Sequence, residues 1–485
     1  MLNIPIIYRA LGTLLYIEGI LLALCLGLGC WFSETNHLAF GVPTAVAFVV
    51  GGLLHFFGRH AENRIGRRDG YLIVSLTWVI FSLVGMLPFL VGGYEPRVAA
   101  AFFETMSGFT TTGASALDDI DSLPHSILFW RCMTHWIGGM GIVFFTIAIL
   151  PNIGGGDLKL FSAEATGLKM DKLHPRLSTT ARWLWSLYLI MTLACMAAYY
   201  LGGMSVFDAV CHALSTIGTG GFSTHQDSMA WFHSNRLLWI STIFMFLGGI
   251  NYTLLYLFLI KRRVRDVFHD SELRCYLTIF FTSVAAICFI LIFADGLSVH
   301  DAVRCAFFNT ASLQSTTGFS EDDFMTWHPT IWLILSLISI IGSCAGSTSG
   351  GLKCIRVLTI WKITRNEFRQ MLHPHAVLPV RINHTLITAQ TARSIFVLFV
   401  VYFILIMIAC FLMVAMGLSL LDAFGLAISS FSNIGPSIGH TVGPLGSWSC
   451  LNDATLWINS FLMLAGRLEV FSLLLPLTPA FWRDE

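Results

Sequence analysis

The fold is decided by Ser107-Gly108-Phe109-Thr110-Thr111-Thr112-Gly113. This stretch ends an apolar segment, residues 98–109, that is much shorter than the roughly 20 residues a spanning helix needs. We expect the segment to enter the membrane and turn back, with its polar end at membrane depth. Irregular backbone is tolerated there only where it is buried in protein or lines a water-filled cavity, because unpaired N–H and C=O groups in lipid cost several kcal/mol each. The stretch therefore predicts a turn that lines a polar pathway.

The same unit recurs three more times along the chain. Each copy has a span, an apolar segment too short to cross, a turn rich in Gly, Thr or Ser, a polar loop and a second span. The other short segments are residues 206–216, 299–314 and 420–431. Matching the turns on their last glycine gives intervals that each suit two spans plus a loop. The predicted turns comprise Thr110, Thr111, Thr112 and Gly113; Ile217, Gly218, Thr219 and Gly220; Ser315, Thr316, Thr317 and Gly318; and Ser432, Asn433, Ile434 and Gly435.

Composition identifies a bilayer as the solvent of this chain. Of its 485 residues, 55% are hydrophobic and 12% are charged, and the mean hydropathy is +0.74. The first apolar stretch lacks a small-residue cleavage site, so we interpret it as an anchor helix. The predicted fold class is an all-α polytopic membrane protein with four pore-loop repeats around one pathway. The predicted spans lie near residues 11–31, 38–58, 70–91, 126–150, 181–201, 237–260, 273–294, 330–362, 392–416 and 454–482.

The distribution of charge predicts the orientation. The formal net charge is zero, from 28 basic and 28 acidic residues, which excludes an overall basic nucleic-acid binder. With the N-terminus in the cytoplasm, Lys and Arg fall mainly in inner loops, as the positive-inside rule requires. The basic residues left outside are Arg97, Arg131, Arg236 and Arg304. Both termini are then cytoplasmic, and the acids of the outer loops either concentrate cations at an entrance or are ordinary solvated charges.

Four re-entrant segments that share one interior predict a cation filter. A short helix followed by a glycine-bearing turn, arranged fourfold, presents a ring of backbone carbonyls that replaces the hydration shell of a cation. Helix C-terminal ends that point inward carry partial negative charge, which favours cations over anions. The threonine hydroxyls either brace the turns or face the ion, and bracing is favoured. Taken alone, a single Gly-Thr turn is more typical of an ordinary loop or of a close helix contact.

A second polar stretch interrupts the eighth predicted span. Residues 342–353 are rich in Gly and Ser, which predicts a broken segment that lines the pathway. A phosphate-binding GxxxxGK[ST] loop does not fit, because Cys354 follows Lys353 and no strand precedes it. We interpret the stretch as a flexible obstruction on the cytoplasmic side of the filter, with a closely packed helix break as the alternative. The predicted gate residues are Gly346, Ser347, Thr348, Ser349, Gly350, Lys353 and Arg467.

Arg467 lies inside the last predicted span, where a charge is expensive unless it faces polar partners or water. Glu469 is two residues away and points off a different face, so carbonyls or hydroxyls of the broken segment are better partners. We hypothesise that Arg467 tethers this segment and holds the pore shut, with snorkelling toward the headgroups as the alternative. Glu104 and Asn309 lie at equivalent offsets before the last glycines of their turns, and we expect them to hydrogen-bond behind the filter.

Taken together, these motifs resemble the Trk/Ktr/HKT superfamily of potassium transporters, and within it the bacterial TrkH/TrkG type. The resemblance runs nearly the full chain and is carried by residues 107–114, 215–224, 316–319, 346–353, 433–436 and 466–469. It implies two N-terminal transmembrane helices in residues 1–69 and four M1–pore loop–M2 repeats, pseudo-fourfold around one pore, in 70–156, 157–265, 266–375 and 376–485. One departure is Ala100, where the other short segments have Asp208, Asp301 and Asp422.

The resemblance also implies a function. It implies potassium uptake across the bacterial inner membrane, with K⁺ as the transported ion and no organic cofactor in this chain. It further implies a homodimer, an intramembrane gating loop, and a cytosolic TrkA-type ring whose RCK domains bind nucleotides. In this family a glycine in all four filter turns goes with potassium, so Gly113 favours potassium over sodium. The basic inner loops 261–265 and 353–381 are candidates for docking the ring, although topology explains them equally well.

Two other classes of function compete with a channel-like transporter. A symporter that couples K⁺ to H⁺ or Na⁺ would rock its broken span between states, and acids inside the spans, of which few are seen, would favour it. An enzyme would need a nucleophile–base set or paired histidines at helical spacing, which the sequence does not offer, so no catalytic residue is predicted. The twelve cysteines fall singly in apolar segments without a CxxC spacing, which is typical of small buried hydrophobes rather than metal ligands.

Overall fold

Helices account for most of the residues that the structure describes. The computed structural model describes residues 2–62, 65–141, 177–376, 378–383 and 385–483. Within those residues, six helices are long and apolar enough to cross a bilayer. They are α1 Ile4–Trp31, α2 Leu38–Phe57, α3 Arg67–Gly85 with its continuation α4 Leu87–Gly92, α9 Leu177–Gly202, α14 Ser271–Phe293 and α18 Ala389–Ala415. The short strands β1 Arg381–Ile382 and β2 Thr385–Leu386 pair antiparallel.

Two of the predicted spans are sharply bent. Residues 237–260 form α11 Asn235–Gly248 and α12 Tyr252–Leu259, at 105° to each other. Residues 454–482 form α20 Asp453–Arg467 and a second piece, Phe471–Leu477, at 113°. The second break contains Glu469 and Val470, whose φ angles of 52° and 67° are left-handed and end the α-helix. Each stretch was expected as one span, and the bend itself was not expected, because hydropathy does not report backbone angles.

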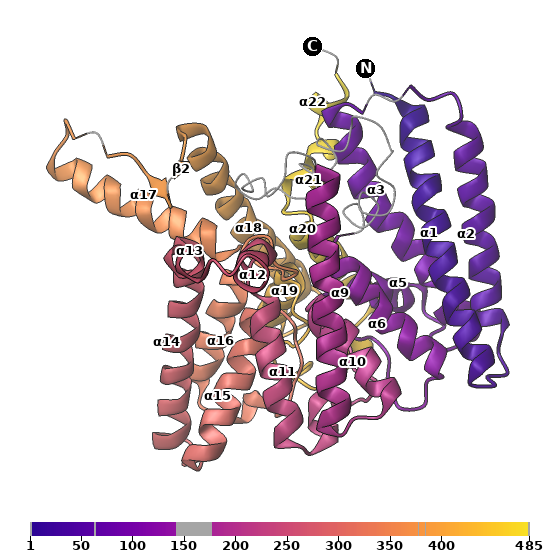
Figure 1. Ribbon diagram of the computed structural model, residues 1–485, viewed down its shortest axis with the longest axis horizontal. Helices are drawn as coiled ribbons and strands as arrows, with labels where there is room; N and C mark the ends of the chain where they lie inside the picture. The colour runs from indigo at the N-terminus through magenta and orange to yellow at the C-terminus, as the bar shows by residue number, and fades with distance from the viewer. Residues whose placement is uncertain (1, 63–64, 142–176, 377, 384, 484–485) are drawn as a thin grey trace.

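The eighth predicted span, residues 330–362, is interrupted as expected. Its apolar part is α16 Pro329–Ile341, which ends at Gly342 with a φ of 69°. The chain becomes helical again in α17 Cys354–Leu372, which projects away from the bundle at the upper left of Figure 1. The fourth predicted span, 126–150, begins as α6 His125–Gly139, and its second half lies outside the described residues.

Four short helices carry the predicted turns, as the repeat pattern required. They are α5 Val98–Phe109, α10 Val206–Gly218, α15 Val299–Gln314 and α19 Leu420–Ser432. Serine caps three of them, because the side chains of Ser205, Ser298 and Ser419 accept the N–H of the aspartate three residues on. The departure at Ala100 corresponds to a start of α5 that has no side-chain cap hydrogen bond.

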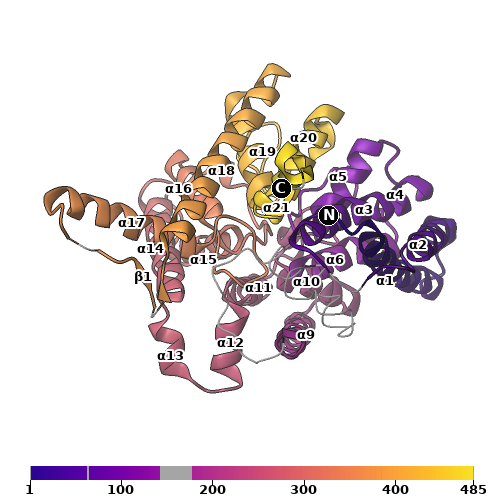
Figure 2. The same cartoon turned by 90° about the horizontal axis from the view of Figure 1, so that it is seen from above.

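Contacts between helices close the four repeats into a ring; Figure 2 views the same helices from above. The helix that follows each turn packs against the short helix of the next repeat: α6 on α10, α11 on α15, and α16 on α19. The circle is completed by α20, which packs on α5. Outside this ring, α1 and α2 stand side by side, and both termini lie at the end from which α17 projects (Figure 1).

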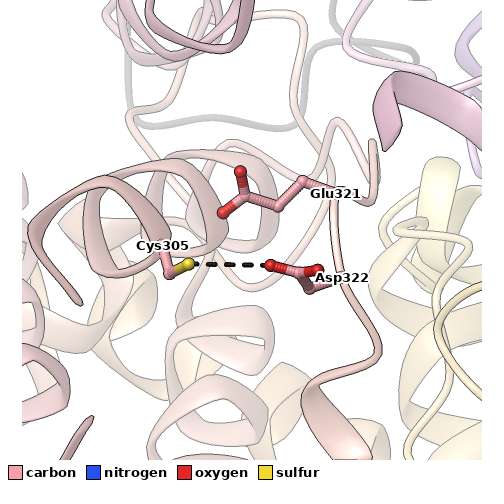
Figure 3. Close-up of side chains that lie close together, drawn as sticks. All are labelled: Cys305, Glu321 and Asp322. Carbon is pink, nitrogen blue, oxygen red and sulfur yellow. Dashed lines mark hydrogen bonds between the residues drawn. The ribbon is translucent and has the colours of Figure 1, made fainter. Parts of the chain in front are cut away.

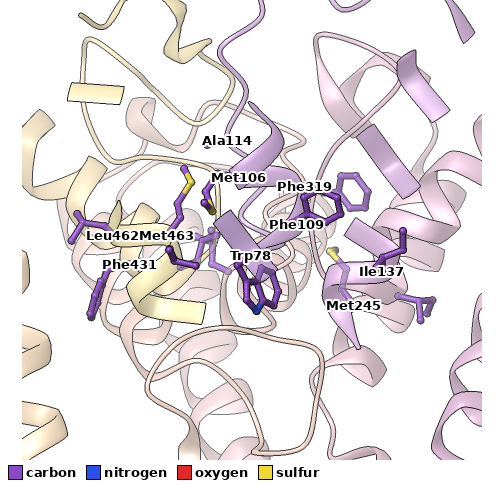
Figure 4. Packing of buried hydrophobic residues seen from close by; sticks show 14 of the residues in the cluster. Trp78, Met106, Phe109, Ala114, Ile137, Met245, Phe319, Phe431, Leu462 and Met463 are labelled. Atoms are coloured by element: carbon purple, nitrogen blue, oxygen red, sulfur yellow. The ribbon is translucent and has the colours of Figure 1, made fainter. Parts of the chain in front are cut away.

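Apolar side chains fill the space behind the turns (Figure 4). Phe109, Phe319 and Phe431 are buried there together with Trp78 and Met463. On the outside, α2, α14 and α18 instead expose large apolar side chains, and only about a third of each helix is buried. A core of this kind with apolar outer faces is what a bundle dissolved in lipid requires.

Candidate ion filter and the loop beside it

The four turns share one backbone conformation. Each has a non-glycine residue in the left-handed region, with φ between 53° and 57°, and a glycine with positive φ two residues later. The residue between them donates its N–H to a serine carbonyl five residues earlier, at 2.8–3.0 Å. The left-handed residues are Thr111, Thr219, Thr316 and Asn433, the glycines are Gly113, Gly221, Gly318 and Gly435, and the serines are Ser107, Ser215, Ser312 and Ser429.

This geometry corrects the predicted register of the second turn. The structural equivalent of residues 110–113 is 218–221, so Gly221 takes the place that sequence matching gave to Gly220. Ile217 belongs to the last turn of α10 and drops out of the set. Two adjacent glycines made the sequence match ambiguous. The signal that resolves it is a serine, which stands six residues before the left-handed glycine in every repeat, here Ser215.

The four turns meet around one axis. The glycine of each turn lies close to the backbone of the next turn. A Cβ on Gly113 would lie 1.9 Å from the carbonyl oxygen of Gly220, in the second turn. A Cβ on Gly221 would lie 2.2 Å from a carbonyl oxygen of the third turn, and a Cβ on Gly318 would lie 1.8 Å from one of the fourth turn. A Cβ on Gly435 would lie 2.7 Å from a carbonyl oxygen of the first turn. Each glycine therefore packs against the carbonyl of the next repeat, and the fourth returns to the first. Any side chain at these positions would force the ring apart.

Hydroxyl groups in the turns bond mainly to neighbouring turn atoms. Thr110 Oγ1 and Thr112 Oγ1 lie 2.8 Å apart, and Ser315 Oγ and Thr317 Oγ1 lie 2.7 Å apart. Asn433 Nδ2 donates to Thr112 Oγ1 at 3.1 Å, which links the fourth turn to the first. With these side chains engaged in bracing, the main-chain oxygens are the groups available to a cation on the axis.

The glycine-rich loop, residues 342–353, lies against the turns. Thr348 Oγ1 donates to the carbonyl of Ile217 at 3.1 Å, and Gly350 N donates to Thr316 Oγ1 at 2.7 Å. A Cβ on Gly350 would lie 2.2 Å from the carbonyl oxygen of Ser432, in the fourth turn. The loop thus touches the second, third and fourth repeats directly.

The other end of the loop is held by its own polar groups and by the break between α11 and α12. The Ser343 hydroxyl bonds to those of Ser347, at 3.2 Å, and of Ser349. Lys353 Nζ is buried and donates to the carbonyl of Ser349. The N–H of Tyr252, at the start of α12, donates to the carbonyl of Gly346 at 3.0 Å. The loop is therefore an ordered structure built into the broken helices around it.

Arg467 joins this loop to the first turn. Its Nη1 donates to the carbonyl of Thr348 at 2.9 Å and to Thr111 Oγ1 at 3.0 Å. Its Nη2 donates to the carbonyls of Gly138 and Gly139, at the end of α6. The guanidinium thus bonds to carbonyls and a hydroxyl, the expected class of partner, and one of these carbonyls belongs to the glycine-rich loop. Glu469 is paired elsewhere, with Arg356 at the start of α17.

Known proteins share the sequence and the architecture of this chain. The family described as TrkH, cation transport protein, matches residues 37–482. The chain belongs to this family. The Trk system potassium uptake protein TrkH of Escherichia coli strain K12 is 36% identical over 449 residues, which cover 92% of each chain. TrkH of Halomonas elongata is 34% identical, over 99% of this chain and 100% of that protein.

A solved structure of the TrkH family superposes on the whole chain. It is the crystal structure of the potassium transporter TrkH from Vibrio parahaemolyticus, with a TM-score of 0.89 at 32% identity, covering 98% of this chain and 99% of that one. Family membership confirms the resemblance drawn from the motifs and the predicted class, an all-α polytopic membrane protein. The relatives are named as uptake proteins, so the prediction of a transporter rather than an enzyme is also confirmed.

The sequence misplaced one charge of the TrkH-family site. Arg131 was expected among the outer basic residues, but it is buried on α6 and its Nε lies 2.8 Å from Glu104 Oε1. Glu104 lies behind the turns, where it also accepts the N–H of Ala116 at 2.8 Å. The sequence contains a signal for the burial of Arg131. Arg131 and His135 are four residues apart and therefore share one face of a short apolar helix.

Acidic groups in the loop after the third turn are partly neutralised in this TrkH-family chain. Cys305, Glu321 and Asp322 have ligand atoms within 4.8 Å of one another (Figure 3). The Arg304 guanidinium forms an ion pair with Glu321 and lies 3.5 Å from the sulfur of Cys305. A metal ion would compete with this fixed positive charge, so we interpret the group as an ion-pair cluster.

A histidine in the loop after the second turn contacts aspartates of the first two repeats. His225 Nδ1 lies 2.8 Å from Asp121 Oδ1, and its Nε2 lies 3.7 Å from Asp208 Oδ1. Its ring stacks on Trp231 with the centroids 3.6 Å apart. Burial lowers the pKa of His225, but the hydrogen bonds and charges of Asp208 and Asp121 outweigh burial and raise the pKa above its ordinary value.

Proposed function

We propose that this chain is the conducting subunit of a potassium uptake system and that the four turns form its selectivity filter. The observation that carries the proposal is the closed ring in which each glycine packs against a carbonyl of the next repeat. Main-chain oxygens from four sides, at the negative ends of four short helices, suit a cation that has shed its water. K⁺ is then the transported ion, in keeping with the names of the relatives.

The filter residues of this proposal differ from the sequence prediction in one turn. They are Thr110 to Gly113, Gly218 to Gly221, Ser315 to Gly318 and Ser432 to Gly435, with Gly221 included and Ile217 left out. Transport is channel-like, which means that the ion moves down its own electrochemical gradient. A symporter that couples K⁺ to H⁺ or Na⁺ is the alternative outcome of the test below.

The glycine-rich loop is the gate of this pathway. Residues 346–350 lie across the turns, and the hydrogen bonds of Thr348 and Gly350 hold them there. Arg467 stabilises the closed position because it donates to the loop and to the first turn at once. Lys353 supports the closed loop through its bond to Ser349.

The surroundings of the pore follow from the charge pattern and the family. The chain lies in a bacterial inner membrane with both termini in the cytoplasm, and it divides into residues 1–69 and four repeats. It forms a homodimer and is opened by a cytosolic TrkA-type ring whose RCK domains bind nucleotides. The basic loops around 261–265 and 353–381 are the docking surface for that ring.

The decisive experiment compares wild type with Gly113→Ser and Gly296→Ser. Both glycines have positive φ, 78° and 70°, so both substitutions cost similar backbone strain. Only the side chain at position 113 meets a carbonyl, because nothing lies within 4 Å of a Cβ at position 296. Gly113→Ser should fail to support growth of an uptake-deficient strain at low potassium, and Gly296→Ser should support it.

Reversal potentials of the reconstituted chain then identify the mechanism. A potassium channel follows the K⁺ Nernst potential at every pH and sodium concentration, whereas a symporter shifts with one of them. The K⁺/Na⁺ permeability ratio of Gly113→Ser should fall by about tenfold, the change that roughly 1.4 kcal/mol of lost discrimination produces. A ratio equal to that of wild type would refute the assignment of the four turns as the filter.

A further inference from the structure

A buried ion pair lies behind the first two turns, away from the pathway and from the glycine-rich loop. Arg131, on α6, and Glu104, on α5, have 1% and 0% of their side chains exposed, and their nearest atoms are 2.8 Å apart. Two charges in such a place are costly to desolvate, and they are held only where the geometry is good and further hydrogen bonds are made. The pair therefore needs a structural explanation beyond its own attraction.

Arg131 holds the chain where it leaves the second turn. Its Nη1 donates to the carbonyl of Ser223 at 3.0 Å, two residues after the ring glycine Gly221. Its guanidinium lies 4.2 Å from the centroid of the Phe222 ring. His135, one helical turn along α6, stacks on the same ring with centroids 4.1 Å apart. Phe222 thus packs against two side chains of the neighbouring repeat.

Glu104 holds the chain where it leaves the first turn. One carboxylate oxygen accepts the N–H of Ala116 at 2.8 Å, and the Ser115 hydroxyl lies 3.1–3.2 Å from both oxygens. Arg131 Nη2 also donates to the hydroxyl of Ser115, at 3.2 Å. One pair therefore fixes the exits of two adjacent turns relative to each other.

The exit of the first turn is tied to the fourth repeat as well. The carbonyl of Ser115 accepts the N–H of Trp448 at 2.8 Å, and the Ser447 hydroxyl donates to the carbonyl of Leu117 at 2.8 Å. Residues 115–117 are consequently linked to three of the four repeats. The third repeat has Asn309 at the offset of Glu104, and that side chain donates to the carbonyl of Cys305 at 3.0 Å.

We propose that Arg131 and Glu104 are positioning residues that set the ion selectivity of this filter, by fixing the outer ends of the first two turns. The inference rests on the proposed function of the turns as a filter. Selectivity among monovalent cations depends on the spacing and stiffness of the coordinating oxygens. The planar fork of arginine holds Glu104, Ser115 and Ser223 at once, which a lysine ammonium on a flexible stem does not reproduce.

The test measures the K⁺/Na⁺ permeability ratio of Arg131→Lys from bi-ionic reversal potentials of the full chain in planar bilayers. The ratio does not depend on how many molecules are folded or open, so a loss of stability alone leaves it unchanged. We expect Arg131→Lys and Glu104→Gln each to lower the ratio by about tenfold, the effect of roughly 1.4 kcal/mol. The matched control is Arg97→Lys, because the side chain of Arg97 is 36% exposed and its ion pairs are with Glu95 and Asp453, not with Glu104.

Each outcome decides between the inference and the function on which it rests. A wild type without potassium preference, or a Gly113→Ser variant that keeps the wild-type ratio, would overturn the filter itself. A selective wild type that is weakened by Gly113→Ser, with Arg131→Lys still at the wild-type ratio, would overturn only the role of the ion pair.

A folding defect does not leave the question open. If Arg131→Lys yields no monodisperse protein, the double variant Glu104→Gln/Arg131→Met replaces it, since removal of both charges leaves no unpaired buried ion. A lowered ratio in the double variant supports the inference, and a wild-type ratio refutes it.

Discussion

Removal of the Arg467 guanidinium should open the pore. Its Nη1 donates a hydrogen bond to the carbonyl of Thr348, in the glycine-rich loop, at 2.9 Å. Its bonds to Thr111, Gly138 and Gly139 anchor the same guanidinium to parts of the chain that do not belong to the loop. Arg467→Ala therefore cuts the tether between a fixed anchor and a loop that must move.

The expected size follows from that one contact. A hydrogen bond with a charged donor contributes about 1.5–3 kcal/mol. Since about 1.4 kcal/mol is a factor of ten in an equilibrium constant, the ratio of open to closed molecules should rise by roughly tenfold to a hundredfold. Arg467→Lys keeps the charge and one donor direction, and its ratio should lie between those of Arg467→Ala and wild type.

The assay is single-channel recording of the reconstituted chain at symmetrical KCl, with open probability as the readout. Arg236→Ala is a suitable control, because it removes an exposed positive charge at the start of α11, outside the glycine-rich loop, the turns and the proposed docking surface. An open probability of Arg467→Ala equal to that of wild type, with unaltered unitary conductance, would show that the arginine is not part of the gate.

Two further predictions concern the loop and the outer surface. Gly350→Ala should increase open probability, because the added methyl lies 2.2 Å from a backbone carbonyl of the fourth turn and cannot be accommodated while the loop is closed; an open probability equal to that of wild type would contradict it. His225→Gln should remove part of the pH dependence of thermal stability. The folded-state pKa of His225 is raised, so its contribution to stability is complete below about pH 6.5, the unfolded pKa, and is lost as the pH rises through the folded pKa. Melting temperatures of wild type and variant should therefore differ at acidic pH and converge at alkaline pH, and parallel curves would exclude this contribution.

Much of the architecture could be predicted from segment length and glycine position alone. Apolar segments of re-entrant length give the four short helices, and the repeated turns place them around a shared interior. The register of the second turn could not be fixed by glycine alone, because Gly220 and Gly221 both satisfy the pattern. The constraint that selects Gly221 is a carbonyl of another repeat at 2.2 Å, which is a contact between segments far apart in sequence.

The bends in two spans and the burial of one charge could not be predicted, for related physical reasons. Hydropathy reports how apolar a segment is and not whether its backbone is helical, so the left-handed angles of Glu469 and Val470 were invisible to it. The positive-inside rule treats every arginine as a surface charge. Arg131 escapes that rule because Glu104, which is remote in sequence, supplies a buried counter-charge.

The glycine-rich loop has one further consequence. It comes from a single repeat, so opening by the proposed gate does not require four helices to tilt together. In this proposal only the glycine-rich loop has to move, and its end continues directly into α17, which projects from the bundle (Figure 1). A pull on α17 at the surface would be passed to the obstruction through a single peptide segment. We therefore expect each pore to switch in one step, with full conductance or none, while the surrounding bundle stays nearly still.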